Sequence, residues 1–209
     1  MYFLDTESTG LSSDSQIIEI GVLETEGSDL RSTGAVYHRY FNPTIDVSRE
    51  SVAVHGMDKS FLMRYPTIEP TDIMDLLSFI GNGTVVIHNS VFDLSLIDNQ
   101  MDRLGFNIWF SSLYVNRLVD TLPVARQSIK ARSHSLDSLC RYFAIDNSAR
   151  QEFHTALVDA EILRQVSVAL KITPVDVSDS LLIFPHDLPQ GVSCVGRPLT
   201  TKHKVQRLL

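Results

Sequence analysis

Two carboxylates, Asp5 and Glu7, lie one residue apart in the stretch "FLDTE" near the start of the chain. In a β-strand, residues i and i+2 point to the same face, so a strand here places the two carboxylates side by side. Anions at that separation repel each other unless a cation lies between them, and a divalent metal ion is the usual one. The alternative is a strand that runs into a solvated acidic loop, and the pair alone does not decide between the two.

A second group of candidate residues lies at the end of "TVVIH", a short β-branched run typical of a buried strand. This strand delivers His88 and Asn89 at its carboxyl end, where ligand sites of α/β proteins usually form. Asp93 follows, and we expect a helix to begin near it. Capping of that helix is the alternative role for Asp93, because Asp is favourable at a helix start.

The third group belongs to the amphipathic stretch "HTALVDAEILRQVSVAL", which predicts a long helix. His154 lies just ahead of this helix. Asp159 lies in its second turn and faces the same way as the apolar stripe that Ala156 begins. Burial of an Asp on such a stripe costs free energy unless the carboxylate is paired or binds a metal ion. The alternative is an Asp159 side chain that tilts toward solvent.

The elements that must position these residues follow from the apolar pattern. Three strand-like runs come first, and their short connections predict an antiparallel meander. Helical and strand-like segments then alternate, which predicts a mixed α/β layer fold. The expected strands are "YFLDT", "QIIEIGVLE", "AVYHRYFNP" and "TVVIH", and the expected helices are "PTIEPTDIMDLLSFI", "FDLSLIDNQMDRL", "SLDSLCRYF" and "TALVDAEILRQVSVAL", with a brief strand and a helix in "RLVDTLPVAR".

Composition is that of a globular protein, with 44% hydrophobic and 21% charged residues in 209. No apolar run is long enough to span a membrane, and no signal peptide is recognisable. Two cysteines are too few for a disulfide framework, and Cys140 lies in an apolar helical stripe, which predicts a buried thiol. We therefore expect a cytoplasmic protein.

Charge is distributed unevenly along the chain. The net charge is −7, yet residues 171–209 hold five Lys or Arg against three Asp or Glu. The excess of acidic residues therefore lies in residues 1–170. Proteins that bind a long stretch of double-stranded nucleic acid through the release of counterions usually have a basic face. If the chain binds nucleic acid, we therefore expect it to contact few nucleotides, or to rely on a partner for the rest.

The periodic pattern weakens after about residue 172, where prolines interrupt the chain. We divide the sequence into a globular body, residues 1–171, and a loosely structured C-terminal tail, residues 172–209. Apolar stretches such as "SLLIF" and "VSCVG" exceed what a solvating linker needs, so the tail is a possible partner-docking segment. A disordered tail without a partner is the alternative.

Taken together, the order Asp5-x-Glu7, Asp93 and His154-x4-Asp159 resembles the histidine-containing (DEDDh) branch of the 3′–5′ exonucleases. The resemblance covers about residues 2–170. It extends to the spacing found in epsilon proofreading subunits of bacterial DNA polymerase III, through "DTESTG", "IIEIG", "VHGM", "VIHNSVFD", "DTLPVAR", "SLDSLC", "IDNSAR" and "HTALVDAEIL".

The resemblance implies an RNase H-like mixed sheet flanked by helices and a site for two divalent cations, Mg²⁺ or Mn²⁺, which prefer carboxylate oxygens. It implies that Asp5 bridges both ions, that Glu7 and Asp159 complete one site, and that Asp93 supports the other through water. It further implies that His154 is the general base, because imidazole titrates near neutral pH.

Further residues would contact the terminal nucleotide at the 3′ end of the substrate, again by resemblance. They include two threonines near the sugar, a glycine that permits close approach of the backbone, and side chains that flank the base or contact the sugar and phosphate. The full set is Thr6, Thr9, Gly10, Leu11, His55, Asn89 and Phe92. The alternative for His55 is a capping or loop histidine.

Three functions remain to be compared. The first is a metal-dependent exonuclease that releases nucleoside 5′-monophosphates from DNA 3′ ends during proofreading, beside a polymerase subunit bound through the tail. The second is a free-standing enzyme that trims RNA or short oligonucleotides, like ribonuclease T or oligoribonuclease. The third is an interaction module with a silent site, which the five filled catalytic positions disfavour. Similarity of "DTLPVAR" and "IDNSAR" to the proofreading subunits favours the first function over the second.

Overall fold

The computed structural model describes residues 1–150, 154–173 and 189–190. Most of the expected tail, including "SLLIF", "VSCVG" and Cys194, lies outside the described residues. The elements in chain order are β1 (Tyr2–Ser8), β2 (Ile17–Glu26), β3 (Arg31–Tyr40), α1 (Arg49–His55), α2 (Lys59–Leu62), α3 (Pro70–Ile80), β4 (Val85–Ile87), α4 (Ser90–Arg103), α5 (Phe110–Tyr114), β5 (Leu118–Asp120), α6 (Thr121–Ser128), α7 (Leu136–Phe143), the 3-10 helix η1 (Ser148–Arg150) and α8 (Ala156–Ala169).

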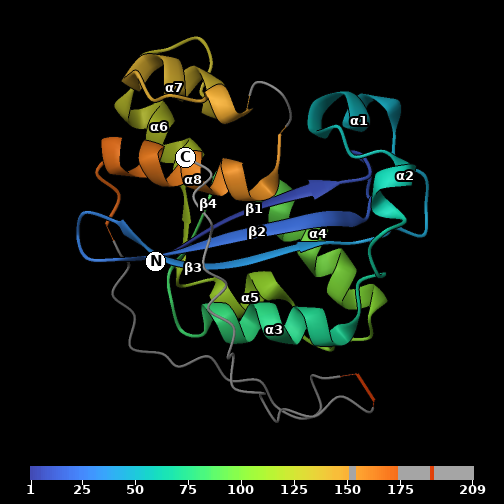
Figure 1. Ribbon diagram of the computed structural model, residues 1–209. Helices are drawn as coiled ribbons and strands as arrows, with labels where there is room; N and C mark the ends of the chain where they lie inside the picture. Colours follow the sequence, from blue (N-terminus) through green and yellow to red (C-terminus); the bar gives the residue numbers. More distant parts are fainter. Residues whose placement is uncertain (151–153, 174–188, 191–209) are drawn as a thin grey trace.

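One mixed sheet of five strands forms the centre of the molecule, in the order β3-β2-β1-β4-β5 (Figure 1). The first three strands pair antiparallel, as the short connections between them predicted. The pairs β1–β4 and β4–β5 are parallel. The carboxyl ends of β1 and β4 therefore meet at one edge of the sheet, where the first two groups of candidate residues were expected. The predicted mixed α/β fold is confirmed.

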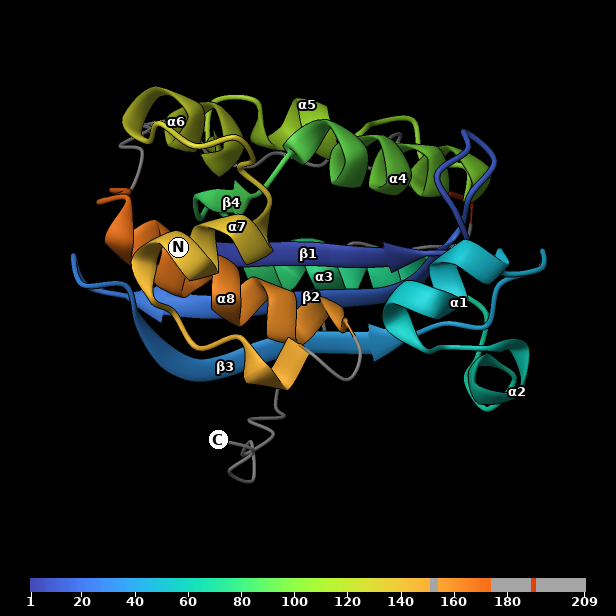
Figure 2. The same ribbon diagram turned by 90° about the horizontal axis from the view of Figure 1, so that it is seen from above.

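Helices cover both faces of the sheet (Figures 1 and 2). One face packs against α3, α4 and α5 through a core that includes Leu4, and the other packs against α6, α7 and α8 through a core that includes Phe3. Because side chains alternate along a strand, Asp5 and Glu7 share the face of Phe3. The two carboxylates therefore lie on the side of the sheet that α8 covers.

The close approach of α8 to β2 depends on Gly21. A Cβ atom at this position would lie 2.4 Å from the backbone nitrogen of Leu157 and 2.5 Å from the carbonyl carbon of Ala156. Neither backbone atom can move aside without displacing the first turn of α8. The glycine of "IIEIG" thus allows the start of α8, with Asp159 on it, to rest directly on the sheet.

The helix that carries Asp93 begins at Ser90, three residues earlier than the sequence predicted. The Asp120 carboxylate explains this start, because it accepts hydrogen bonds from the backbone N–H groups of Asn89 and Ser90, both at 2.9 Å, and from the Ser90 hydroxyl. These bonds satisfy N–H groups that a helix start leaves without partners. Asp93 consequently lies inside the first turn and is not the cap.

Three short helices, α1, α2 and α5, were not predicted, because each is shorter than two turns and shows little periodicity. The predicted burial of Cys140 is confirmed. Ser135 caps α7 as expected, since its hydroxyl oxygen accepts from the Ser138 N–H. Among the described residues, no helix is long and apolar enough to cross a membrane.

Candidate active site

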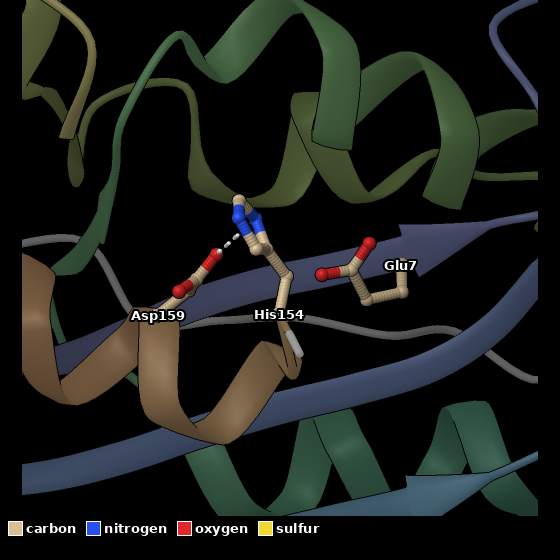
Figure 3. A group of neighbouring side chains, drawn as sticks. All are labelled: Glu7, His154 and Asp159. Carbon is tan, nitrogen blue, oxygen red and sulfur yellow. Dashed lines mark ion pairs between the residues drawn. The ribbon is translucent and has the colours of Figure 1, made fainter. Parts of the chain in front are cut away.

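Glu7, His154 and Asp159 converge on one point from two elements (Figure 3). Glu7 projects from β1, His154 lies two residues before α8, and Asp159 lies in the first turn of α8. One ligand atom from each of the three lies within 4.8 Å of the other two. Asp159 is 3% exposed, so it faces the sheet and not the solvent. The sequence expectation of a core-facing Asp159 is therefore confirmed, one turn earlier in the helix than expected.

Asp93 is tied to β1 by two hydrogen bonds. Its Oδ1 atom accepts from the Thr6 backbone N–H at 3.0 Å and from the Thr6 hydroxyl at 2.7 Å. These bonds fix the start of α4 against the strand that carries Asp5 and Glu7. Asp93 is 4% exposed, and burial raises its pKa to about 7, although the two bonds from Thr6 act in the opposite direction.

The remaining carboxylates also hold protons more tightly than usual. Burial raises the pKa of Asp5 well above its ordinary value, and repulsion from Asp93, Asp159 and Glu7 adds to this effect. Burial raises the pKa of Glu7 to about 8, with further contributions from Asp159 and Glu19. The four carboxylates therefore form one cluster whose negative charge is incompletely compensated by the protein.

Glu19 is a buried carboxylate that the sequence reasoning did not single out. It lies opposite Glu7 in the β1–β2 register and is fully buried. Its Oε1 atom lies 2.7 Å from Nε2 of His38, which provides a polar partner from β3. The signal was present in "QIIEIG", where a single Glu interrupts an apolar strand. Glu19 increases the negative field at Glu7.

His154 is held in place by the backbone and by Asp159. Its N–H donates to the Val54 carbonyl at 3.3 Å, which joins the segment before α8 to α1. Its Nδ1 atom lies 3.8 Å from Oδ2 of Asp159. Burial and the nearby Arg150 guanidinium lower the pKa of His154, so that the neutral imidazole, which can accept a proton, predominates at neutral pH.

Arg150 pairs with the Asp159 carboxylate and was missed at the sequence level. Its Nε and Nη2 atoms donate to the two oxygens of Asp159 at 2.6 and 2.9 Å, and its Nη1 donates to Asp137. Sequence reasoning used "IDNSAR" only as part of a resemblance. The available signal was an Arg four residues ahead of His154, placed before an acidic site.

A cleft of about 630 Å³ opens beside the carboxylates, lined by residues of β1, α4, α6 and the loop before α7. Of the predicted site residues, Asp5, Thr6, Asn89, Phe92 and Asp93 line it. Arg126, Arg132 and Arg150 also line the cleft and supply positive charge there. His88 also lines the cleft, but its two ring nitrogens contact Thr121 Oγ1 and the His134 carbonyl, both at 2.8 Å, which indicates a structural role.

The other predicted substrate residues lie in or near the turn after β1 and are not among those lining this cleft. Thr9 and His55 are each 3% exposed. The Thr9 hydroxyl oxygen accepts from the Gln16 N–H at 2.9 Å, and His55 Nδ1 accepts from the Met57 N–H at 3.0 Å. Leu11, by contrast, is 88% exposed, and an ideal Cβ at Gly10 would lie 3.3 Å from the Ser15 hydroxyl oxygen.

The donor set fits hard divalent cations. Carboxylate oxygens are the ligands that Mg²⁺ and Mn²⁺ prefer. The raised pKa values of Asp5, Glu7 and Asp93 indicate negative charge that a cation would offset. Glu7, Asp159 and His154 are close enough to share one ion. The residues present are therefore suited to a metal-dependent reaction on an anionic substrate.

Comparisons with known proteins agree with this geometry. Residues 2–166 match the family described as Exonuclease. The DNA polymerase III subunit epsilon of Rickettsia typhi is 39% identical over 169 residues, which cover 80% of this chain and 72% of the relative. The same subunit of Escherichia coli is 36% identical over 174 residues, covering 80% and 69%.

A solved structure shares the fold at low sequence identity. The nuclease domain of 3'hExo, described as a DEDDh family member bound to rAMP, has a TM-score of 0.65 and is 14% identical, with 86% of this chain and 96% of that one covered. At this identity the likeness supports the arrangement of the sheet and helices alone.

Proposed function

This chain belongs to the exonuclease family, and we propose that it is a metal-dependent 3′–5′ exonuclease that releases nucleoside 5′-monophosphates from DNA 3′ ends. The observation that carries the proposal is the gathering of Asp5, Glu7, Asp93, Asp159 and His154 from three distant parts of the sequence beside one cleft. The relatives named DNA polymerase III subunit epsilon support DNA as the substrate.

Asp5, Glu7, Asp93 and Asp159 are the residues that would hold two divalent cations, Mg²⁺ or Mn²⁺. When bound, such ions supply positive charge that stabilises the negative charge developing on the attacked phosphate. The hydrogen bonds from Thr6 to one oxygen of Asp93 orient this carboxylate. The buried positions of Asp93 and Asp159 keep these carboxylates in fixed directions.

His154 is the proposed general base. A neutral imidazole accepts the proton of the attacking water, and the lowered pKa of His154 keeps the imidazole neutral at physiological pH. The nearby Asp159 carboxylate stabilises the imidazolium that forms. The bond from the His154 N–H to the Val54 carbonyl holds the backbone in position during this transfer.

The proposed substrate residues lie partly in the lining of the cleft and partly in or near the turn after β1. We propose that Phe92 and the exposed Leu11 contact the terminal base and that Asn89 contacts the sugar and phosphate. Gly10 permits the backbone to approach the terminal sugar. Thr6, Thr9 and His55 shape this region, and their buried positions favour roles through the backbone or through support of the turn.

Comparison of substrates tests the proposal directly. The protein is expected to degrade a primer with a mismatched 3′ terminus faster than a matched one, because a mismatch has already lost the pairing free energy that fraying costs. Product release is measured with Mg²⁺ and with Mn²⁺ on matched DNA, mismatched DNA and RNA of the same sequence. Strong preference for RNA would contradict this proposal and favour an oligonucleotide-trimming enzyme. Equal rates on matched and mismatched ends would contradict a role in proofreading.

Residues 172–209 are proposed to bind a polymerase subunit in the cytoplasm and to be separable from the exonuclease body. Truncation after Thr173 keeps Ile172, which is 8% exposed and whose N–H donates to the Ser167 carbonyl at 3.0 Å. The truncated protein is expected to hydrolyse a short single-stranded oligonucleotide at nearly the full rate and to lose co-elution with the catalytic polymerase subunit of its own organism. Loss of hydrolysis or of solubility would show that the tail is part of the body.

A further inference from the structure

Arg150 occupies the carboxylate that the exonuclease reaction needs for a metal ion. Both oxygens of Asp159 accept from this guanidinium, at 2.6 and 2.9 Å. The Arg150 side chain is 12% exposed and that of Asp159 is 4% exposed, so water screens this pair little. One oxygen of the same Asp159 belongs to the group with Glu7 and His154 that could hold an ion.

A divalent cation and the guanidinium cannot both bind Asp159 without strong repulsion. Divalent ions bind carboxylate oxygens at about 2.0 to 2.6 Å, and the Arg150 nitrogens are hardly farther from the same oxygens. Two cations at such close range in a poorly screened site repel strongly. An ion that binds Asp159 must therefore displace the guanidinium, or it binds with lower affinity.

Arg150 has a second anchor that does not belong to the carboxylate cluster. Its Nη1 atom donates to Oδ1 of Asp137, which lies in the first turn of α7 and has a side chain 42% exposed. The same oxygen accepts from Asn147 Nδ2 at 3.2 Å. The η1 backbone is independently fixed, since the Arg150 N–H donates to the Asn147 carbonyl at 3.0 Å. A guanidinium that leaves Asp159 can thus stay paired with Asp137.

We propose that Arg150 is a positioning residue that sets the affinity of the site for divalent cations: it compensates Asp159 while no ion is bound and withdraws to Asp137 when an ion takes its place. This inference rests on the proposed function. Arg150 lowers the cost of keeping Asp159 buried and ionised in the metal-free protein. The same contact stabilises the metal-free state relative to the metal-bound state. The affinity for metal is therefore lower than the carboxylates alone would give.

Titration of Mn²⁺ into the metal-stripped full-length chain by calorimetry tests the proposal. Arg150→Gln is expected to lower the dissociation constant roughly tenfold or more, the range that corresponds to loss of charge-assisted hydrogen bonds to a carboxylate. Arg150→Lys keeps the charge with fewer directed donors and should give a smaller decrease. Arg164→Gln is the matched control, because Arg164 is also a partly buried arginine but lies within α8 and pairs with Glu161, and it should leave the constant unchanged.

Asp137→Asn is expected to act in the opposite direction and raise the dissociation constant, because the displaced guanidinium loses its anchor. The effect of Asp137→Asn should shrink when Arg150 is already Gln, which a double-mutant cycle measures. Thermal unfolding adds an independent readout: Arg150→Gln should lower the melting temperature of the metal-free protein and enlarge its rise on addition of Mn²⁺. If Arg150→Gln fails to fold, Arg150→Lys still shows whether the dissociation constant for Mn²⁺ falls or rises.

An unchanged or higher dissociation constant in Arg150→Gln, or in Arg150→Lys where only that variant folds, would overturn the proposal. An equal effect of Asp137→Asn in the presence and absence of Arg150 would also overturn it, because it would show a simple long-range charge effect. Hydrolysis of single-stranded DNA by the wild-type protein is assayed separately. Absence of that hydrolysis would contradict the proposed function, whereas the Mn²⁺ affinities judge only the role of Arg150.

Discussion

Replacement of Asp5 by asparagine is expected to abolish hydrolysis of a single-stranded oligonucleotide, with a loss of roughly 10³-fold or more, because bound cations supply several kcal/mol of charge stabilisation in the transition state. Asp5 is buried and is repelled by Asp93, Asp159 and Glu7. Removal of this anion should weaken metal binding most. The measurement is the initial rate of mononucleotide release, with Mn²⁺ affinity determined in parallel.

Stability should change in the opposite direction to activity. A carboxyl whose pKa is raised by folding lowers stability as the pH rises through that pKa, so the metal-free wild type should lose stability between about pH 4 and pH 8, as expected from the pKa of about 8 for Glu7. Asp5→Asn removes one repelled charge and should flatten this dependence. Metal-free melting temperatures at several pH values check this expectation.

Asp46→Asn is a suitable control for the Asp5 experiment. Asp46 has a side chain 85% exposed and pairs with Lys59 on the surface, so the substitution removes the same charge outside the carboxylate cluster. It should leave both activity and stability nearly unchanged. Substantial metal-dependent hydrolysis by Asp5→Asn would contradict the assignment of the carboxylates as metal ligands.

Replacement of His154 by alanine is expected to lower kcat by roughly 10²-fold to 10⁴-fold, the usual contribution of a positioned general base. In the wild type, log kcat should rise with pH and level off below neutral pH, because burial and Arg150 lower the pKa of His154. The variant should lose this rise. Rates across the pH range, measured where the chemical step limits turnover, check both statements.

Metal affinity separates the role of a base from that of a ligand at His154. Its ring lies close enough to Glu7 and Asp159 to contact a shared ion, so a ligand role predicts a large loss of Mn²⁺ affinity in His154→Ala. The base role predicts a much larger effect on kcat than on affinity, and partial recovery of the rate when imidazole is added. A pH profile that is the same in wild type and variant would contradict a role of His154 in proton transfer.

Local sequence patterns predicted most of the long elements. The antiparallel order of β1, β2 and β3 followed from three strand-like runs with short connections, and α3, α7 and α8 followed from helical spacing and caps. The start of α4 was wrong by three residues, because the bonds that fix it come from Asp120, thirty residues farther along the chain. Such long-range contacts do not change the local pattern of apolar residues in the segment that they stabilise, so this pattern cannot predict them.

The sequence by itself determined the chemical character of the site. Strand alternation placed Asp5 and Glu7 on one face, and the apolar stripe of α8 turned Asp159 inward, with His154 just ahead of the helix. The tertiary structure decided which of these groups meet. Gly21 lets the backbone of α8 rest on β2 and thereby brings Asp159 to Glu7.

The pairing of Arg150 with Asp159 and the burial of Thr9 and His55 were likewise decided by packing. The physical reason is that periodicity reports only which face of an element is buried. Which partner lies on that face depends on how closely distant backbones can approach and on which buried charges find a counter-charge.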